Sequence, residues 1–154
     1  TIILSNENGG NIYYTSDGST PTNSSSKYTS PITISKSTVI KAITIESGKI
    51  KSKVTTNSYI LGFDSTLPIL SLSTDNRYLF DDYIGIYVKG KNGAKSTCMD
   101  DGELYNFEQD WYRPVRIEYF NNNQKEFSKK AEFAISGQCS RWWNKKKSFR
   151  FELD

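Results

Sequence analysis

The chain has 154 residues, with 20 Lys and Arg against 17 Asp and Glu, no His, two Cys and 14% aromatic residues. This length accommodates one ordinary domain or two small ones, and the aromatic content excludes wholesale disorder. The absence of histidine excludes serine and cysteine catalytic systems that use an imidazole base, and zinc sites with imidazole ligands. No apolar run approaches the about 20 residues of a membrane-spanning helix. A net charge of only +3 gives no reason to expect nucleic-acid binding.

The composition changes near residue 62, which predicts a domain boundary there. The first 61 residues contain 12 Ser and 10 Thr but no Cys, Trp or Phe, whereas all three of these types occur from Phe63 onward. We therefore predict two domains, residues 1–61 and 67–154, joined by a short linker at 62–66. Because the chain begins at Thr1 without an initiator Met or a signal peptide and ends at Asp154 within a strand-like run, we expect it to be part of a longer protein.

In the first domain, short runs of β-branched and aromatic residues alternate with turn signals. The predicted strands lie at 2–4, 12–15, 32–34, 39–45 and 54–61, and the turn signals are Asn8-Gly9-Gly10, Asp17-Gly18, Ser30-Pro31 and Ser47-Gly48. This spacing predicts a small β-sandwich. Residues 39–45 are too apolar for a half-exposed strand, so we expect that strand to be central.

In the second domain, apolar residues alternate with polar ones in four segments. The apolar sets are Ile84, Ile86 and Val88; Val115, Ile117 and Tyr119; Ala131, Phe133 and Ile135; and Phe149, Phe151 and Leu153. The opposite, solvated face is predicted to carry Arg116, Glu118, Glu132, Arg150 and Glu152. Asn121-Asn122-Asn123 is typical of a hairpin tip. Only residues 76–80 and 124–130 are candidates for a helical turn, so the whole chain is predicted to be all-β: a small immunoglobulin-like sandwich followed by a second antiparallel domain.

Two cysteines and two groups of acidic residues are candidates for covalent or metal chemistry. Cys98 and Cys139 are the only thiols, and in a secreted protein such a pair predicts one disulfide; two independent reduced thiols are the alternative. Without histidine, neither cysteine is expected to be catalytic. The acidic residues are Asp81, Asp82, Asp100, Asp101, Glu103, Glu108 and Asp110, which raise the alternative of a calcium ion. Because they lack EF-hand spacing, we expect turn-capping or solvated carboxylates and no metal or other cofactor.

The aromatic pairs Trp111-Tyr112 and Trp142-Trp143 are the candidate ligand-binding residues. Neighbours in a strand point to opposite faces, so at least one ring of each pair is a candidate for exposure. Exposed Trp and Tyr rings are the usual platforms for sugar rings, although closing a core is the more common use of Trp. Arg141, Lys145, Lys146 and Lys147 flank the second pair and would favour an anionic polymer, or else form a solvated edge.

Three segments of the first domain carry a family resemblance. They are Ile12-Tyr13-Tyr14-Thr15-Ser16-Asp17-Gly18-Ser19-Thr20-Pro21-Thr22, the run from Ser26 to Ile32, and Ile40-Lys41-Ala42. Residues 1–61 resemble the chitobiase/β-hexosaminidase C-terminal-type domain, a small immunoglobulin-like sandwich of many secreted bacterial proteins. The family usually has a further strand before the position of Thr1. In physical terms, the Asp17 carboxylate is placed to accept backbone N–H groups of its own turn, and Pro21 imposes an extended exit.

The second domain carries a different resemblance. Its motifs are Leu67–Asp75, Leu79–Asp82, Gly85–Val88, Asp110–Val115, Gly137–Arg141 and Lys146–Arg150. Together they resemble the region that leads into the kinase-like domain of the spore-coat protein H (CotH) family. Tyr112 stands where that family often has an acidic residue, so a salt bridge to Arg113 is not assumed. The resemblance implies that the metal-binding and catalytic segments of the family lie beyond Asp154, and that Arg141 and Lys145–Lys147 approach nucleotide phosphates only in a complete protein.

We therefore expect no enzymatic activity from this chain. The leading hypothesis is a non-catalytic accessory or scaffold region of a secreted, bacterial, spore-coat-protein-H-like surface protein, located outside the cell, that positions a downstream domain of the same polypeptide and binds polysaccharide or another cell-surface component. One alternative is the structural N-terminal part of an atypical kinase, inactive by itself, and another is a pure spacer without a ligand. We expect a monomer with no membrane span and no nucleic-acid partner.

Overall fold

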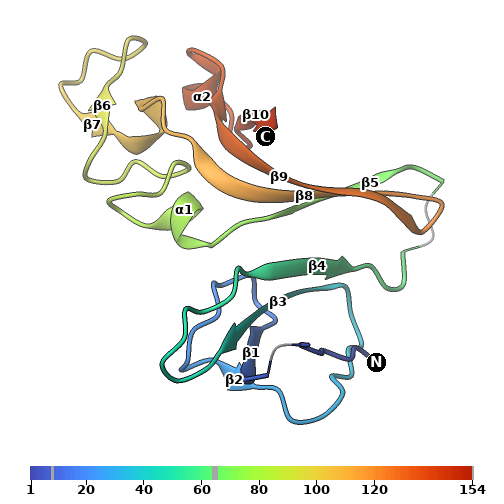
Figure 1. Cartoon of the computed structure of the whole chain (residues 1–154). Helices are drawn as coiled ribbons and strands as arrows, with labels where there is room; N and C mark the ends of the chain where they lie inside the picture. The colour runs from blue at the N-terminus through green and yellow to red at the C-terminus, as the bar shows by residue number, and fades with distance from the viewer. Residues whose placement is uncertain (8, 64–65, 154) are drawn as a thin grey trace. The chain divides into compact units, whose positions relative to one another are not determined.

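The computed structural model describes residues 1–7, 9–63 and 66–153 and consists mainly of antiparallel strands (Figure 1). Its helical segments are single turns: α1 (Arg77–Phe80), the 3-10 turn η1 (Asn106–Glu108) and α2 (Ser140–Trp143). The predicted all-β class is therefore confirmed. Among the residues described, no helix has the length and apolar character needed to cross a membrane.

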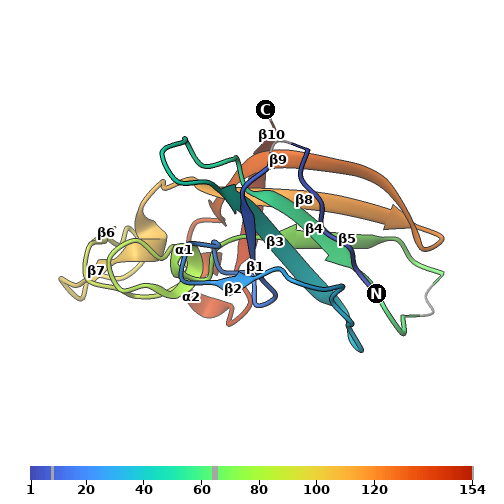
Figure 2. The same ribbon diagram turned by 60° about the horizontal axis from the view of Figure 1, so that its bottom comes forward.

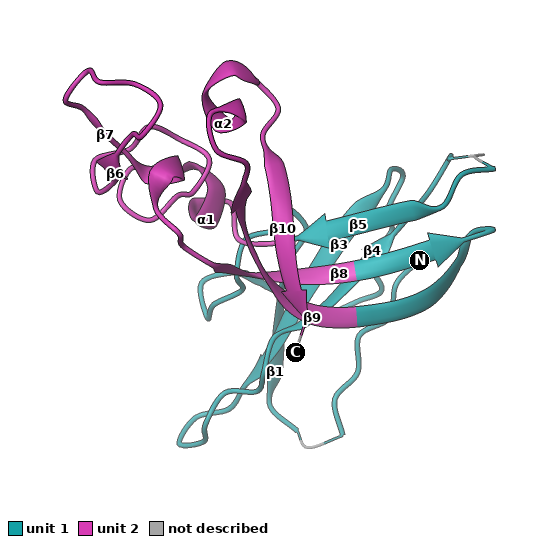
Figure 3. Ribbon diagram, turned by 90° about the horizontal axis from the view of Figure 1, so that it is seen from above, with its two compact units in different colours: residues 1–73, 118–128 teal, residues 74–117, 129–154 magenta. Residues whose placement is uncertain are grey.

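The chain forms two compact units that do not follow one cut along the sequence (Figure 3). Unit 1 contains residues 1–73 and 118–128, and unit 2 contains residues 74–117 and 129–154. Strands β8 (Arg113–Asn121) and β9 (Gln124–Ser136) contribute residues to both units. The predicted linker at 62–66 includes Asp64 and Ser65, which lie outside the described residues, and the sequence boundary stays a prediction.

Unit 1 contains a sheet with the strand order β2-β1-β3-β4 (Figure 2). Its strands are β1 (Asn11–Thr15), β2 (Ser26–Lys27), β3 (Thr38–Ile45) and β4 (Thr55–Tyr59). All neighbouring pairs are antiparallel, and β3 lies between β1 and β4, as its apolar sequence predicted. Ile40 and Ile43 of β3 are buried. Outside this sheet, Ile2 and Ile32 exchange backbone hydrogen bonds of 2.8 and 2.9 Å in an isolated bridge.

The Asp17-Gly18 turn is held both locally and by the central strand. The Asp17 carboxylate accepts hydrogen bonds from the backbone N–H of Ser19 at 3.0 Å and from its hydroxyl at 2.6 Å, so the predicted turn contact is confirmed. The carbonyl of Gly18, whose φ is +85°, accepts a hydrogen bond from the buried Lys41 ammonium at 2.5 Å. Because an ammonium is costly to bury without an acceptor, this contact ties the turn to β3.

The hairpin between β8 and β9 turns at Asn122 and Asn123, as predicted. These two residues have φ angles of +48° and +60°, which is the backbone geometry of the type I′ turn that suits two-residue hairpins. The chain therefore enters β9 directly at Gln124. The alternative of a helical turn at 124–130 is wrong, because these residues extend the antiparallel ladder instead.

Glu118 of β8 is buried in unit 1, although the alternation predicted it on a solvated face. Its side chain has 0% exposure, and its carboxylate accepts hydrogen bonds from the Ser58 backbone N–H and from the Lys125 ammonium, each at 2.6 Å. Lys125 also donates to the Asn57 side-chain oxygen at 2.9 Å. The sequence prediction failed because Phe120, on the same strand face as Glu118, is buried too, so this face is not a wet one.

The contacts of Glu118 decide the direction of its pKa shift. Burial by itself would raise the pKa, but the hydrogen bonds from Lys125 and Ser58 outweigh burial, and the pKa lies below its ordinary value. A lowered carboxyl pKa stabilises the folded chain at pH values above the unfolded-state pKa of about 4.3, and this stabilisation disappears as the pH falls through the folded-state pKa.

We predict that Glu118→Gln lowers the free energy of unfolding by about 2–3 kcal/mol at pH 7, because it removes a buried, hydrogen-bonded charge and takes the carboxylate away from Lys125. The difference from the wild type should shrink as the pH falls below the unfolded-state pKa of about 4.3 and then through the lower folded-state pKa of Glu118. Urea unfolding followed by circular dichroism measures both effects. Glu132→Gln, at an exposed position of β9, is the matched control and should change little; equal effects of the two substitutions at pH 7 would contradict the assignment.

The core of unit 2 lies on one face of β8 and β9. The buried cluster consists of Ile86, Tyr105, Phe107, Val115, Ile117, Ala131, Phe133 and Ile135. The remaining strands around it are β6 (Ala94–Lys95), β7 (Leu104–Tyr105) and β10 (Ser148–Leu153), and β5 (Ile69–Ser73) of unit 1 completes the strand order β10-β9-β8-β5. The predicted burial of the apolar sets on β8 and β9 is therefore largely confirmed.

Two predicted strand faces of unit 2 are wrong or incomplete. Residues 84–88 form no strand; instead, the N–H groups of Ile86 and Tyr87 donate at 2.9 Å to the carbonyls of Tyr78 and Leu79. Gly85 allows this fold-back, because a Cβ there would lie 2.5 Å from the Asp81 carbonyl oxygen. Ile86 is buried, whereas Ile84 is exposed.

Strand β10 forms as predicted, but only part of its apolar face is covered. Phe149 packs against the core, while Phe151 is 36% exposed and Leu153 is 65% exposed. Their partners across the ladder are Phe133 and Ala131 of β9. Because β10 is the last strand in its sheet order, side chains along it have described strand neighbours on one side only.

Candidate functional site

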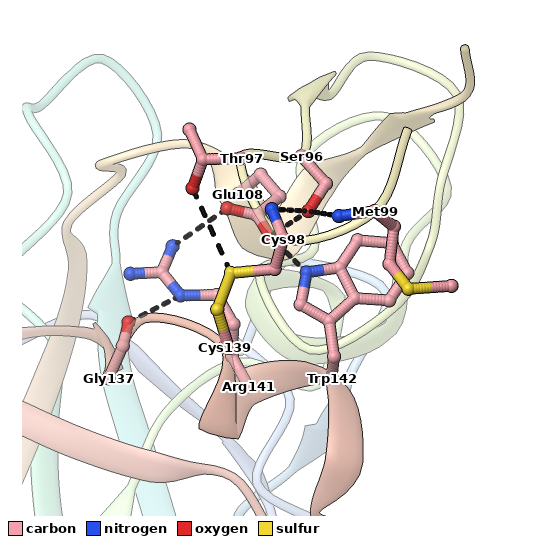
Figure 4. The surroundings of a disulfide bond; sticks show 9 residues. All are labelled: Ser96, Thr97, Cys98, Met99, Glu108, Gly137, Cys139, Arg141 and Trp142. Atoms are coloured by element: carbon pink, nitrogen blue, oxygen red, sulfur yellow. Dashed lines mark hydrogen bonds and ion pairs between the residues drawn. A yellow bond between two sulfur atoms is a disulfide. The ribbon is translucent and has the colours of Figure 1, made fainter. Parts of the chain in front are cut away.

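A disulfide in unit 2 joins the segment after β6 to the start of α2 (Figure 4). The bond links Cys98 to Cys139, the pair expected from the sequence, with a Cα–Cα distance of 5.4 Å. Cys98 is half-buried and Cys139 is exposed. The Ser96 hydroxyl accepts a hydrogen bond from the Cys98 backbone N–H at 2.9 Å, which fixes the approach of the first cysteine. The bridge therefore attaches the helical turn that carries both adjacent tryptophans.

Glu108, at the end of η1, interacts with several polar groups beside the disulfide (Figure 4). Its carboxylate accepts hydrogen bonds from the Trp142 indole N–H and from the Ser96 hydroxyl, and it lies 3.5 Å from the Arg141 guanidinium. Arg141 also donates to the Phe107 carbonyl at 2.9 Å. The Glu108 and Arg141 side chains are largely buried, so this cluster is a structural ion pair and not an open charged surface.

The Trp142 ring closes the core of unit 2. It packs edge to face against Tyr105 at 4.1 Å and Phe107 at 5.0 Å between ring centroids. The premise that Trp142 and Trp143 are neighbours in a strand is wrong, because both lie in α2. This turn is held by the backbone and by the disulfide at Cys139, the residue just before its first one. In this turn one indole is directed to the core and the next is left outside.

Lys147 lies among aromatic rings, unlike its neighbours in the basic run. Its ammonium donates to the Arg141 carbonyl and lies 4.1 Å from the centroid of the Phe107 ring. Burial, followed by the charge of Arg141, lowers the pKa of Lys147. Lys145 and Lys146 are exposed. Of the basic residues proposed to contact anions, these two therefore present their charge to solvent.

Guanidinium groups cover the rings of Trp111 and Tyr112. Arg113 lies 4.7 Å from the Trp111 ring centroid, and Arg150 lies 5.1 Å from that of Tyr112. Arg150 also donates hydrogen bonds to the Tyr112 hydroxyl and the Asp110 carboxylate, each at 2.9 Å. Neither residue is in a strand, since β8 begins at Arg113. These contacts occupy ring faces that a sugar would need.

Trp143 differs from the other tryptophans in its exposure. The structure describes all three, and Trp143 is 72% exposed while Trp111 and Trp142 pack against the core of unit 2. Two exposed lysines follow it in the sequence, Lys145 and Lys146. A flat ring in solvent beside cations is an arrangement that binds a sugar face and an anionic substituent together.

The acidic candidates for calcium are used in turns and ion pairs. Asp81 accepts hydrogen bonds from the N–H groups of Tyr83 and Ile84, which lower its pKa, and Asp82 pairs with Lys91 at 2.9 Å. Asp101 accepts a hydrogen bond from the Tyr105 hydroxyl, which raises the Tyr105 pKa to about 12. Within residues 1–7, 9–63 and 66–153, no group of three acidic or cysteine side chains forms a metal-binding cluster.

Sequence reasoning missed the structural roles of Glu108, Glu118 and Lys41. Glu108 was considered only as a metal ligand, and its pairing with Arg141 joins positions too far apart in the sequence for local patterns to show. For Glu118 a signal was present, because Phe120 makes the supposed wet face of β8 partly apolar. For Lys41, a lysine within the apolar run of β3 was the available sign of a buried ammonium.

Residues 2–59 match the model of the family described as Fn3 associated. This match supports a fibronectin-type-III-like or immunoglobulin-like domain in that part of unit 1, and it indicates a non-catalytic accessory domain. Neither the curated proteins nor the solved structures include a match to the chain.

Replacing both cysteines, as in Cys98→Ser with Cys139→Ser, is expected to lower the free energy of unfolding by about 4 kcal/mol, because the bridge closes a loop across 41 positions. Thermal unfolding of the variant and of the reduced wild type should give the same loss. Ser35→Ala, at an exposed position of unit 1, controls for substitution itself. A double variant with unchanged stability would show that the bridge does not constrain the unfolded chain.

Proposed function

We propose that this chain is a non-catalytic, extracellular accessory region of a secreted bacterial surface protein similar to spore-coat protein H, and that it binds polysaccharide through Trp143. The Fn3-associated match supports the accessory character of residues 2–59. The extracellular location is supported by the disulfide, because such bonds persist mainly in oxidising compartments. The observation that carries the sugar proposal is the 72% exposure of the Trp143 indole.

The position of Trp143 suits a binding platform. Its neighbour Trp142 is anchored by Tyr105, Phe107 and Glu108, and Cys139 fixes the beginning of the same turn. A ring carried by a rigid turn loses little conformational freedom when a ligand stacks on it. Lys145 and Lys146 add positive charge nearby, so the ligand favoured by this surface is an acidic polysaccharide.

The basic segment also supports a second candidate function. A structural N-terminal part of an atypical kinase would use Lys145 or Lys146 for phosphate contacts, since both ammonium groups are exposed. Such a role would give affinity for a nucleotide and not for a polysaccharide. A pure spacer would bind neither.

Affinity electrophoresis in gels that contain pectate, alginate or neutral mannan tests the proposal. We expect the wild type to be retarded most by the acidic polymers and Trp143→Ala to lose most of this retardation. The double variant Lys145→Ala/Lys146→Ala should lose only the part of the retardation that added salt also removes. Tyr83→Ala, which removes another exposed ring of unit 2, is the matched control and should behave like the wild type.

Absence of retardation on all three polymers would reject this sugar site. Titration with ATP and Mg²⁺, followed by Trp fluorescence, distinguishes the remaining candidates. Saturable binding that Lys146→Ala weakens would favour the kinase part, and no response to either class of ligand would favour the spacer.

A further inference from the structure

The outer edge of strand β10 is the feature of unit 2 that the proposed function leaves unused. β10 stands at the end of the order β10-β9-β8-β5 (Figure 3), and its ladder partner in the described chain is β9. The register pairs Phe149 with Ile135 and Leu153 with Ala131. An edge strand of this kind offers backbone N–H and C=O groups to an added strand.

The sequence of β10 is complementary to itself in the antiparallel sense. It consists of Ser148-Phe149-Arg150-Phe151-Glu152-Leu153. If two copies pair about Phe151, Arg150 of each copy lies opposite Glu152 of the other, and Phe149 lies opposite Leu153. Every charged position then meets the opposite charge and every apolar position meets an apolar one. Charged residues on an edge usually oppose pairing, but this order of charges favours it.

Both charged side chains of β10 already have polar partners within unit 2. Arg150 donates hydrogen bonds to the Tyr112 hydroxyl and to Asp110, so an ion pair with Glu152 of a second copy has to share or replace these contacts. Glu152 lies directly across the ladder from Glu132, a like charge, and its side chain accepts a hydrogen bond from Tyr112. A cation supplied on the other side of β10 would offset the repulsion between the two carboxylates.

The apolar face of β10 also has surface to bury. Phe151 and Leu153 are 36% and 65% exposed. In the symmetric arrangement Phe151 meets its own copy on the two-fold axis, and each exposed Leu153 meets a Phe149 that already packs on the core. The contact is therefore both electrostatic and apolar, with the two kinds of side chain on opposite faces of the pair.

We propose that two copies of this chain associate through antiparallel pairing of their β10 strands, with two-fold symmetry about Phe151 and reciprocal Arg150–Glu152 ion pairs. This departs from the monomer expected from the sequence. Because a single strand pair forms a small interface, the dimer is weak and depends on concentration.

Sedimentation equilibrium of the whole chain, from micromolar to millimolar concentration, tests the proposal. The mass should rise from that of a monomer toward that of a dimer. A monomer throughout this range overturns the proposal, as does capture of unrelated extended peptides on β10 without self-association. Glu152→Lys should weaken the dimer by about tenfold or more, because both symmetry-related attractions become repulsions. Glu7→Lys makes the same change of net charge at an exposed position of unit 1 and should have no effect.

Mixing two charge variants tests the register itself. Glu152→Lys and Arg150→Glu should each associate poorly alone, because each variant places like charges opposite one another. An equimolar mixture should form a heterodimer, because the Glu152→Lys copy then presents two positive charges on β10 and the Arg150→Glu copy presents two negative charges opposite them. If near-ultraviolet circular dichroism shows that both variants are folded and the mixture still does not associate, this register is rejected. If Arg150→Glu does not fold, Leu153→Lys replaces it: weaker association supports the contact, and unchanged association overturns it.

Discussion

The buried carboxylate of Glu118 is the constraint on which the arrangement of unit 1 depends. A charge with no exposure is tolerated only when donors replace the water it has lost, and here the donors are the Ser58 N–H of β4 and the Lys125 ammonium of β9. A shift of β8 by one residue would direct Glu118 to the other face and remove its hydrogen bonds with Ser58 and Lys125. The carboxylate thus specifies one register of the β8–β9 hairpin relative to β4, which apolar contacts alone would define less sharply.

In unit 2 another buried carboxylate, that of Glu108, holds a region where the strands are short. Beside η1 the β6–β7 ladder is only two residues long, and the chain there is held by Glu108, whose carboxylate accepts hydrogen bonds from Trp142 and Ser96 and lies close to the Arg141 guanidinium. The disulfide lies beside this cluster but stabilises the fold in a different way, because it reduces the conformational entropy of the unfolded chain. Covalent and polar constraints together replace the extensive strand pairing that orders β8 and β9.

How far the sequence predicted the structure depends on whether the relevant interaction is local. The alternation of Val115 with Ile117 and of Ala131 with Phe133, and the turn chemistry of Asn122 and Asn123, are properties of neighbouring residues, and these elements were predicted correctly. Residues 84–88 alternate equally well, but their backbone bonds go to α1, and only the space requirement at Gly85 distinguishes the two outcomes. In the candidate site, the aromatic pairs were found from the sequence, but their covering partners Arg113 and Arg150 were not, because cation–ring contacts leave no regular spacing.

The two adjacent tryptophans show why composition alone overstates a binding surface. Trp142 and Trp143 have the same side chain and are adjacent in sequence, yet the turn of α2 directs the first toward Tyr105 and Phe107 and leaves the second in solvent. The burial of Trp142 is what makes Trp143 useful, since an exposed ring on an unanchored turn would lose more conformational entropy on stacking. The basic run shows the same division, because the Lys147 ammonium packs over the Phe107 ring while Lys145 and Lys146 remain exposed. A binding surface at α2 is therefore smaller than its sequence suggests, and the residues removed from it are those that hold it in place.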